Sequence, residues 1–121
     1  MSNSGLSKTI VVIDDDASIR TALSRLLRAS GFQVQTFESA EAFLATAGVA
    51  PACLVVDVHL PGMNGSELQE RLGGIFPVVA ISGFGEDMTR KRALEAGAAA
   101  FLHKPFADAE LIGAIERAVA K

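Results

Sequence analysis

The chain has 121 residues, of which 50% are hydrophobic, and a formal net charge of -3 at pH 7. This length supports one domain with one core, and the absence of a basic stripe argues against direct contact with nucleic acid. No apolar run reaches the length of a membrane span, and residues 1–7 lack the apolar core of a signal peptide. We therefore expect a frayed, flexible tail over residues 1–7, a domain over residues 8–121, no membrane contact and a cytoplasmic location.

Five short segments are typical of strands: four are apolar, and the second, residues 33–37, alternates between polar and apolar residues. The first is rich in β-branched residues, and the third, Cys-Leu-Val-Val-Asp, shows no polar alternation before its final acid. Such a run indicates a strand that is buried on both faces, as in a parallel sheet covered by helices. Its single cysteine, Cys53, is expected to be a buried structural thiol. The predicted strands are residues 8–13, 33–37, 53–57, 77–82 and 99–102.

A helical pattern follows each strand. The first helix is expected to stop at Gly31, while Ser39 and Asn64 are predicted to cap the second and third helices. Phe43 and Leu44 are expected on the buried face of the second helix. The last two helices are predicted over residues 86–96 and 107–120. Alternating strands and helices favour right-handed crossovers and an open, parallel, three-layer α/β sandwich.

Polar side chains gather where the predicted parallel strands end, and all these ends lie at one edge of the sheet. Several carboxylates at this edge would repel one another, and Mg²⁺ would relieve the repulsion because it prefers hard oxygen ligands. A nucleophilic Asp, a lysine and a hydroxyl beside such a cation suit phosphoryl transfer. These residues are Asp14, Asp15 and Asp16 after the first strand, Asp57, Ser82 and Lys104.

The chain from Lys8 onward resembles the receiver domain of a two-component response regulator. The motifs are the Asp14-Asp15 pair, Asp57 followed by Leu-Pro-Gly-Met-Asn-Gly, Ser82-Gly83, and Lys104-Pro-Phe. Residues 39–44 also resemble receivers that precede DNA-binding domains in regulators of nitrogen fixation. The resemblance implies a doubly wound (βα)5 flavodoxin-like, CheY-like sandwich with five parallel strands in the order 2-1-3-4-5. It also implies a cis bond before the proline that follows Lys104.

The resemblance assigns roles around the acceptor. Asp57 would be the phosphoacceptor, with Lys104 contacting the phosphoryl group and pairing with Asp57 before transfer. Mg²⁺ would be held by Asp57, by Asp15 directly, by Asp14 through a water, and by the backbone carbonyl of His59. The alternative for Asp57 is a helix-cap or turn aspartate, and the alternative for Lys104 is a surface lysine before a proline.

Two further residues would form the switch. Ser82 would donate to the phosphoryl oxygen, and Phe101 would turn inward when Ser82 moves; the alternatives are a turn serine and a core phenylalanine. Asp16 is interpreted equally well as the N-cap of the first helix.

The implied partners are a sensor histidine kinase or phosphotransfer protein. A homodimer would form through the face made by the fourth helix, fifth strand and last helix, and a DNA-binding effector domain would follow if the chain is part of a longer regulator. The protein would be a signalling switch that catalyses its own phosphorylation and slow dephosphorylation. Three alternatives stay open: an aspartate-nucleophile phosphohydrolase, a flavodoxin-like nucleotide binder, and a receiver that only docks.

Overall fold

The computed structural model describes residues 8–83 and 87–120. The tail predicted over residues 1–7 and the predicted first residue of the fourth helix, Glu86, lie outside the described residues. Strands and helices alternate along the chain: β1 (Thr9–Ile13), α1 (Ala17–Ala29), β2 (Gln33–Phe37), α2 (Ala40–Leu44), β3 (Cys53–Asp57), α3 (Gly65–Leu72), β4 (Val78–Ser82), α4 (Asp87–Glu95), β5 (Ala100–His103) and α5 (Asp108–Val119).

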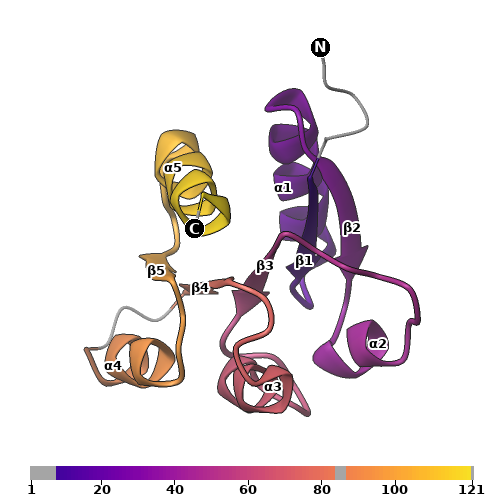
Figure 1. Cartoon of the computed structure of the whole chain (residues 1–121). Coiled ribbons are helices and arrows are strands. Elements are labelled where there is room, and N and C mark those ends of the chain that lie inside the picture. Colours follow the sequence, from indigo (N-terminus) through magenta and orange to yellow (C-terminus); the bar gives the residue numbers. More distant parts are fainter. Residues whose placement is uncertain (1–7, 84–86, 121) are drawn as a thin grey trace.

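The five strands form one parallel sheet in the order β2-β1-β3-β4-β5. Helices α1 and α5 cover one face of the sheet, and α2, α3 and α4 cover the other (Figure 1). The predicted three-layer sandwich and its strand order are therefore confirmed. None of the described helices is both long and apolar enough to cross a bilayer.

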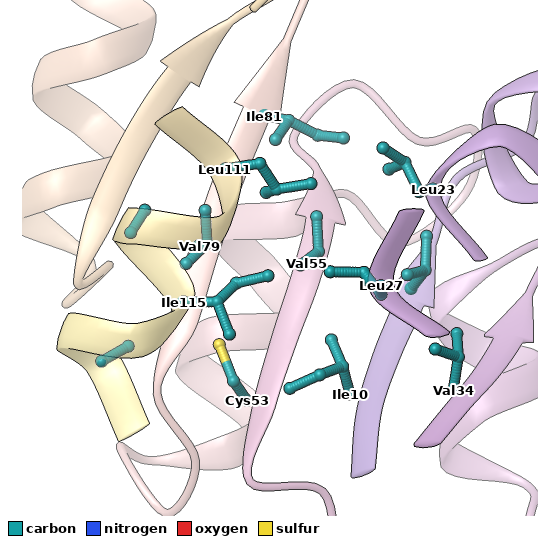
Figure 2. Packing of buried hydrophobic residues seen from close by; sticks show 13 residues of the cluster. Ile10, Leu23, Leu27, Val34, Cys53, Val55, Val79, Ile81, Leu111 and Ile115 are labelled. Atoms are coloured by element: carbon teal, nitrogen blue, oxygen red, sulfur yellow. The ribbon is translucent and has the colours of Figure 1, made fainter. Parts of the chain in front are cut away.

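The core consists of layers on both faces of the sheet, which explains the unbroken apolar strands. In β1, Ile10 packs with residues of α1 and α5 (Figure 2), and Val12 belongs to the same cluster. Val11 and Ile13 pack on the opposite face with residues of α2 and α3. All four are fully buried. Each such side chain contributes about 1.5–3 kcal/mol through removal from water, so this strand is held from both sides.

The single cysteine lies inside the first of these layers, as predicted. Cys53 is fully buried at the start of β3. Burial raises the pKa of its thiol to about 12, against a smaller lowering by a backbone hydrogen bond from Val79. The thiol is therefore protonated and shielded at neutral pH.

The predicted caps of α2 and α3 are confirmed, whereas the burial of one residue and the ends of three strands differ from the predictions. The Oγ of Ser39 accepts from the Ala42 N–H at 3.0 Å, and Asn64 forms a reciprocal capping box with Glu67. Leu44 was expected to be buried but is 37% exposed. Helix α2 has only five residues, and consecutive helical residues point about 100° apart, so burial of Phe43 turns Leu44 toward solvent.

The second correction concerns the ends of the strands. The fifth strand was predicted over residues 99–102 but spans Ala100–His103, because Ser82 pairs with His103 at the end of β4. The first and fourth strands each begin one residue later than predicted. The peptide bond between Lys104 and Pro105 is cis, as the family resemblance implied.

Candidate functional site

The carboxyl ends of β1, β3 and β4 bring the predicted polar residues to one edge of the sheet. Ile13 pairs with Val56, so Asp14, the next residue, lies level with Asp57. Asp57 in turn pairs with Ile81, directly before Ser82. Asp14, Asp57 and Ser82 are all buried, with exposed fractions of 0%, 7% and 0%. The parallel topology thus gathers polar groups in a part of the molecule that is otherwise apolar.

Lys104 joins the first and third strands through its side chain. Its Nζ lies 3.0 Å from Asp14 Oδ2 and 3.2 Å from Asp57 Oδ2. The backbone N–H of Lys104 donates to the Ser82 carbonyl at 2.7 Å, which fixes the start of the lysine stem beside β4. The Lys104 ammonium therefore forms ion pairs with both carboxylates.

The charges of these neighbours alter the acidity of the lysine. Partial burial lowers the pKa of Lys104, but hydrogen bonds and Coulomb attraction from Asp14 and Asp57 outweigh burial and raise it above its usual value of 10.5. The ammonium is therefore the form present at neutral pH.

Three carboxylates form a cluster that could hold a metal ion. Asp14, Asp15 and Asp57 each offer an oxygen, and these oxygens lie within 4.8 Å of one another. Asp15 is exposed, whereas the other two are buried, so the cluster opens toward solvent on one side. Carboxylate oxygens with space for water are the donor set that Mg²⁺ prefers, and these residues fit such a cation.

Backbone N–H groups hold the two buried carboxylates in place. Asp14 Oδ1 accepts from the N–H of Asp16 at 2.9 Å, and Asp57 Oδ1 accepts from the N–H of His59 at 2.8 Å. Each carboxylate oxygen can accept more than one bond. These contacts therefore fix the carboxylates while leaving acceptor capacity at the cluster.

The structure separates Asp16 from the cluster. Its Oδ1 accepts from the N–H of Ser18 at 2.8 Å and of Ile19 at 3.4 Å, so Asp16 is the N-cap of α1. The capping alternative for this residue is therefore confirmed.

The remaining predicted residues lie around the group. His59 is exposed and contacts Asp57 through its backbone N–H. Phe101 is half-buried in β5 and packs against a small cluster formed by Val58, Ala80 and Ala93. This places Phe101 beside β4, α4 and Val58, the residue that follows Asp57 at the end of β3.

Two contacts at this edge were not predicted from the sequence. The guanidinium of Arg20 donates to the Asp14 carbonyl oxygen at 2.6 Å. The carboxylate of Glu41 accepts from the backbone N–H of Met63 at 3.0 Å, across 22 positions of the chain. The spacing of these residues along the chain predicts neither contact, because the fold of the sheet determines where the two partners of each bond lie.

The family model described as the response regulator receiver domain matches residues 10–116. The chain therefore belongs to the response regulator receiver family, which makes it a signalling domain. Among similar proteins, response regulator protein TmoT of Ectopseudomonas mendocina is 41% identical over 114 residues, covering 91% of this chain and 52% of TmoT. Transcriptional regulatory protein FixJ of Bradyrhizobium diazoefficiens is 42% identical over 114 residues, covering 91% of this chain and 56% of FixJ.

Solved structures agree with this assignment. The crystal structure of FixJ-N superposes with a TM-score of 0.86 at 39% identity, covering 99% of this chain and 96% of that one. The BeF3-activated DrrB receiver domain gives a TM-score of 0.87 at 28% identity, with coverage of 96% and 100%. The chain spans about half the length of the curated relatives it matches, 52% of TmoT and 56% of FixJ.

Proposed function

We propose that this chain is a phosphoaccepting receiver. It would catalyse Mg²⁺-dependent transfer of a phosphoryl group to Asp57 from the phosphohistidine of a sensor histidine kinase or phosphotransfer protein. The observation that carries the proposal is the position of Lys104, whose Nζ contacts both Asp14 and Asp57, 90 and 47 positions away in the chain. A nucleophile, its counter-ion and a cluster able to hold a cation are thereby assembled in one place.

The transfer exchanges one bond to phosphorus for another. An Oδ atom of ionised Asp57 forms the new P–O bond, and the P–N bond of the donor breaks with its electron pair passing to the imidazole nitrogen, which takes a proton from solvent. Lys104 moves its contact from Asp57 to the phosphoryl oxygens as charge develops there. Asp14, Asp15, Asp57 and the backbone carbonyl of His59 would hold Mg²⁺, which when bound would neutralise charge on the phosphoryl oxygens.

The phosphorylated state would be transmitted through Ser82 and Phe101. Ser82 ends β4 beside Asp57 and would donate its hydroxyl to a phosphoryl oxygen. Movement of Ser82 would leave space into which Phe101 turns, and Phe101 already packs against the cluster that includes Ala93 of α4. The readout would therefore be a population shift on α4 and β5.

The test is mass spectrometry after incubation with acetyl phosphate and Mg²⁺. We expect the wild type to gain the mass of one phosphoryl group and Asp57→Asn to gain none. Asp16→Asn is the matched control, because it removes the same charge from the N-cap of α1, and it should gain the group normally. A wild type that gains no mass with either acetyl phosphate or a phosphorylated donor domain would refute the proposal.

We further propose a homodimer through the face made by α4, β5 and α5. Arg90 and Arg92 are exposed on α4, while Asp108 and Glu110 are exposed at the start of α5. Two copies could pair these opposite charges across a twofold axis. Sedimentation velocity should show a heavier species with beryllofluoride, and charge reversal at Arg90 should abolish it.

We propose control of transcription as the output. FixJ is named a transcriptional regulatory protein, and this chain matches about half of it. The receiver would then act on an effector domain that binds DNA. A reporter assay with this receiver in place of the matching part of FixJ, comparing wild type with Asp57→Asn, tests this output.

A further inference from the structure

The loop between β3 and α3 carries the backbone beside the proposed phosphoacceptor. Its first end is held by β4, because the Val58 N–H donates to the Ile81 carbonyl at 3.0 Å, and its last end is held by the capping box of Asn64 at the start of α3. The middle of the loop is held from outside, because the N–H of Met63 donates to Glu41 Oε2 at 3.0 Å.

Glycine at position 62 permits the close approach of this carboxylate. Gly62 has φ of 74°, and a Cβ there would lie 2.6 Å from Glu41 Oε2. The Glu41 carboxylate therefore lies directly against the loop backbone. A side chain at position 62 would be strained by the positive φ and would also displace Glu41.

The carboxylate itself is held by a well-anchored helix. Ser39 caps α2, and Phe43 is buried with its ring centroid 5.5 Å from that of Phe37. The hydrogen bond from Met63 is the main cause that lowers the pKa of Glu41, with its own N–H adding to the effect. Glu41 is thus an ionised acceptor on a fixed support.

We propose that Glu41 is a positioning residue for the phosphorylation site. By holding Met63, it fixes the loop that presents the His59 backbone to Asp57, whose Oδ1 accepts the His59 N–H at 2.8 Å. Glu41 acts through the loop and touches neither Asp57 nor the acid cluster in the described structure. The proposal rests on the function proposed above and adds to it a contact between α2 and the site.

Three variants of the chain test this role. Glu41→Ala removes the acceptor, Glu41→Gln keeps an amide oxygen that can accept from Met63, and Glu38→Ala is the control. Glu38 is exposed and makes no hydrogen bond within residues 8–83 and 87–120, so its removal changes the net charge equally. The Mg²⁺ dissociation constant is measured by calorimetry, and the initial rate of phosphorylation is measured with acetyl phosphate.

We expect Glu41→Ala to weaken Mg²⁺ binding and slow phosphorylation about three- to tenfold, less than the loss of a direct partner of a ligand. Glu41→Gln should restore most of both, and Glu38→Ala should match the wild type. Equal Mg²⁺ constants for wild type and Glu41→Ala, or a Glu41→Gln variant as impaired as Glu41→Ala, would overturn the proposal.

A spectroscopic readout separates this proposal from the function on which it rests. The amide proton of Met63 should shift with the titration of Glu41, at a pKa below the usual 4.5, and should lose this shift in Glu41→Gln. A Met63 amide indifferent to Glu41 would refute the positioning role. A wild type that binds Mg²⁺ but takes no phosphoryl group would instead refute the proposed function, and the calorimetric constants would still decide the role of Glu41.

Discussion

The backbone N–H of Gly65 donates to the carbonyl oxygen of Val58 at 3.3 Å, so the loop after β3 closes on itself beside Asp57. A Cβ on Gly65 would lie 2.9 Å from Val58 Cα and 3.3 Å from the Asp57 carbonyl oxygen. The obstacle is backbone, which cannot move aside as a flexible side chain can. Glycine at this position therefore allows α3 to begin against the end of β3.

Gly65→Ala is expected to destabilise the protein and disturb the site. The clash with Val58 should cost about 1–3 kcal/mol in the free energy of unfolding, measured by urea denaturation. Gly83→Ala is the matched control, because a Cβ there meets nothing within 4 Å, and its unfolding free energy should equal that of the wild type. A urea midpoint of Gly65→Ala equal to that of the wild type would contradict the tight contact between position 65 and the Val58 backbone.

Mg²⁺ should stabilise the folded protein through Asp15. Binding to the folded state alone adds about 2.7 kcal/mol at a hundredfold excess over the dissociation constant, which raises the thermal midpoint. Asp15→Asn should lose this increase, because Asp15 belongs to the three-carboxylate cluster. Asp16→Asn should keep it, since Asp16 caps α1 instead. Equal Mg²⁺ responses in the two variants would argue against the assignment of the cluster.

The contribution of Lys104 to stability should depend on alkaline pH. Its pKa is raised above 10.5 in the folded state, so the stabilisation is fully present below that value and is lost as pH rises through the folded pKa. Lys104→Met should lower the free energy of unfolding by about 1–3 kcal/mol near neutral pH, since it leaves two buried carboxylates without their counter-ion. Urea denaturation should show that the difference in unfolding free energy between wild type and Lys104→Met becomes smaller above pH 10.5. A difference in unfolding free energy that becomes larger there would contradict this account.

Cys53 should be unreactive until the protein unfolds. Its thiol is fully buried with a pKa raised to about 12, so little thiolate is present or accessible. A thiol-specific reagent at neutral pH should label the native protein only at the rate of unfolding, and should label it completely in urea. Rapid native labelling would show that the core beneath α5 opens far more readily than its packing indicates.

The layered fold could be predicted because its signals are local. Unbroken apolar runs such as Leu54–Val56 mark strands covered on both faces, and alternation with helices forces the strands to be parallel. From this topology, the meeting of Asp14, Asp57 and Ser82 follows without side-chain detail. The resemblance to the receiver family then predicted the strand order 2-1-3-4-5.

The finer contacts were not predictable, because they depend on side chains from distant segments. Pairing of Lys104 with Asp57 was predicted, but its second bond to Asp14 was not, since the flexible lysine stem can reach either carboxylate. The bond from Met63 to Glu41 joins the loop before α3 to helix α2, and their separation of 22 positions has no periodic meaning. The one-residue shift of β5 likewise depends on its partner strand.

The charged residues of the acid site lie at or just after the ends of three strands, β1, β3 and β5, which are synthesised at different times. A nascent chain that has emerged from the ribosome only through β4 presents Asp14, Asp15 and Asp57 to solvent, but not yet Lys104. Repulsion among these acids then opposes their approach until the last strand adds its ammonium. Assembly of the acid site therefore depends on β5, and a chain that lacks this strand would leave the acids without their ammonium.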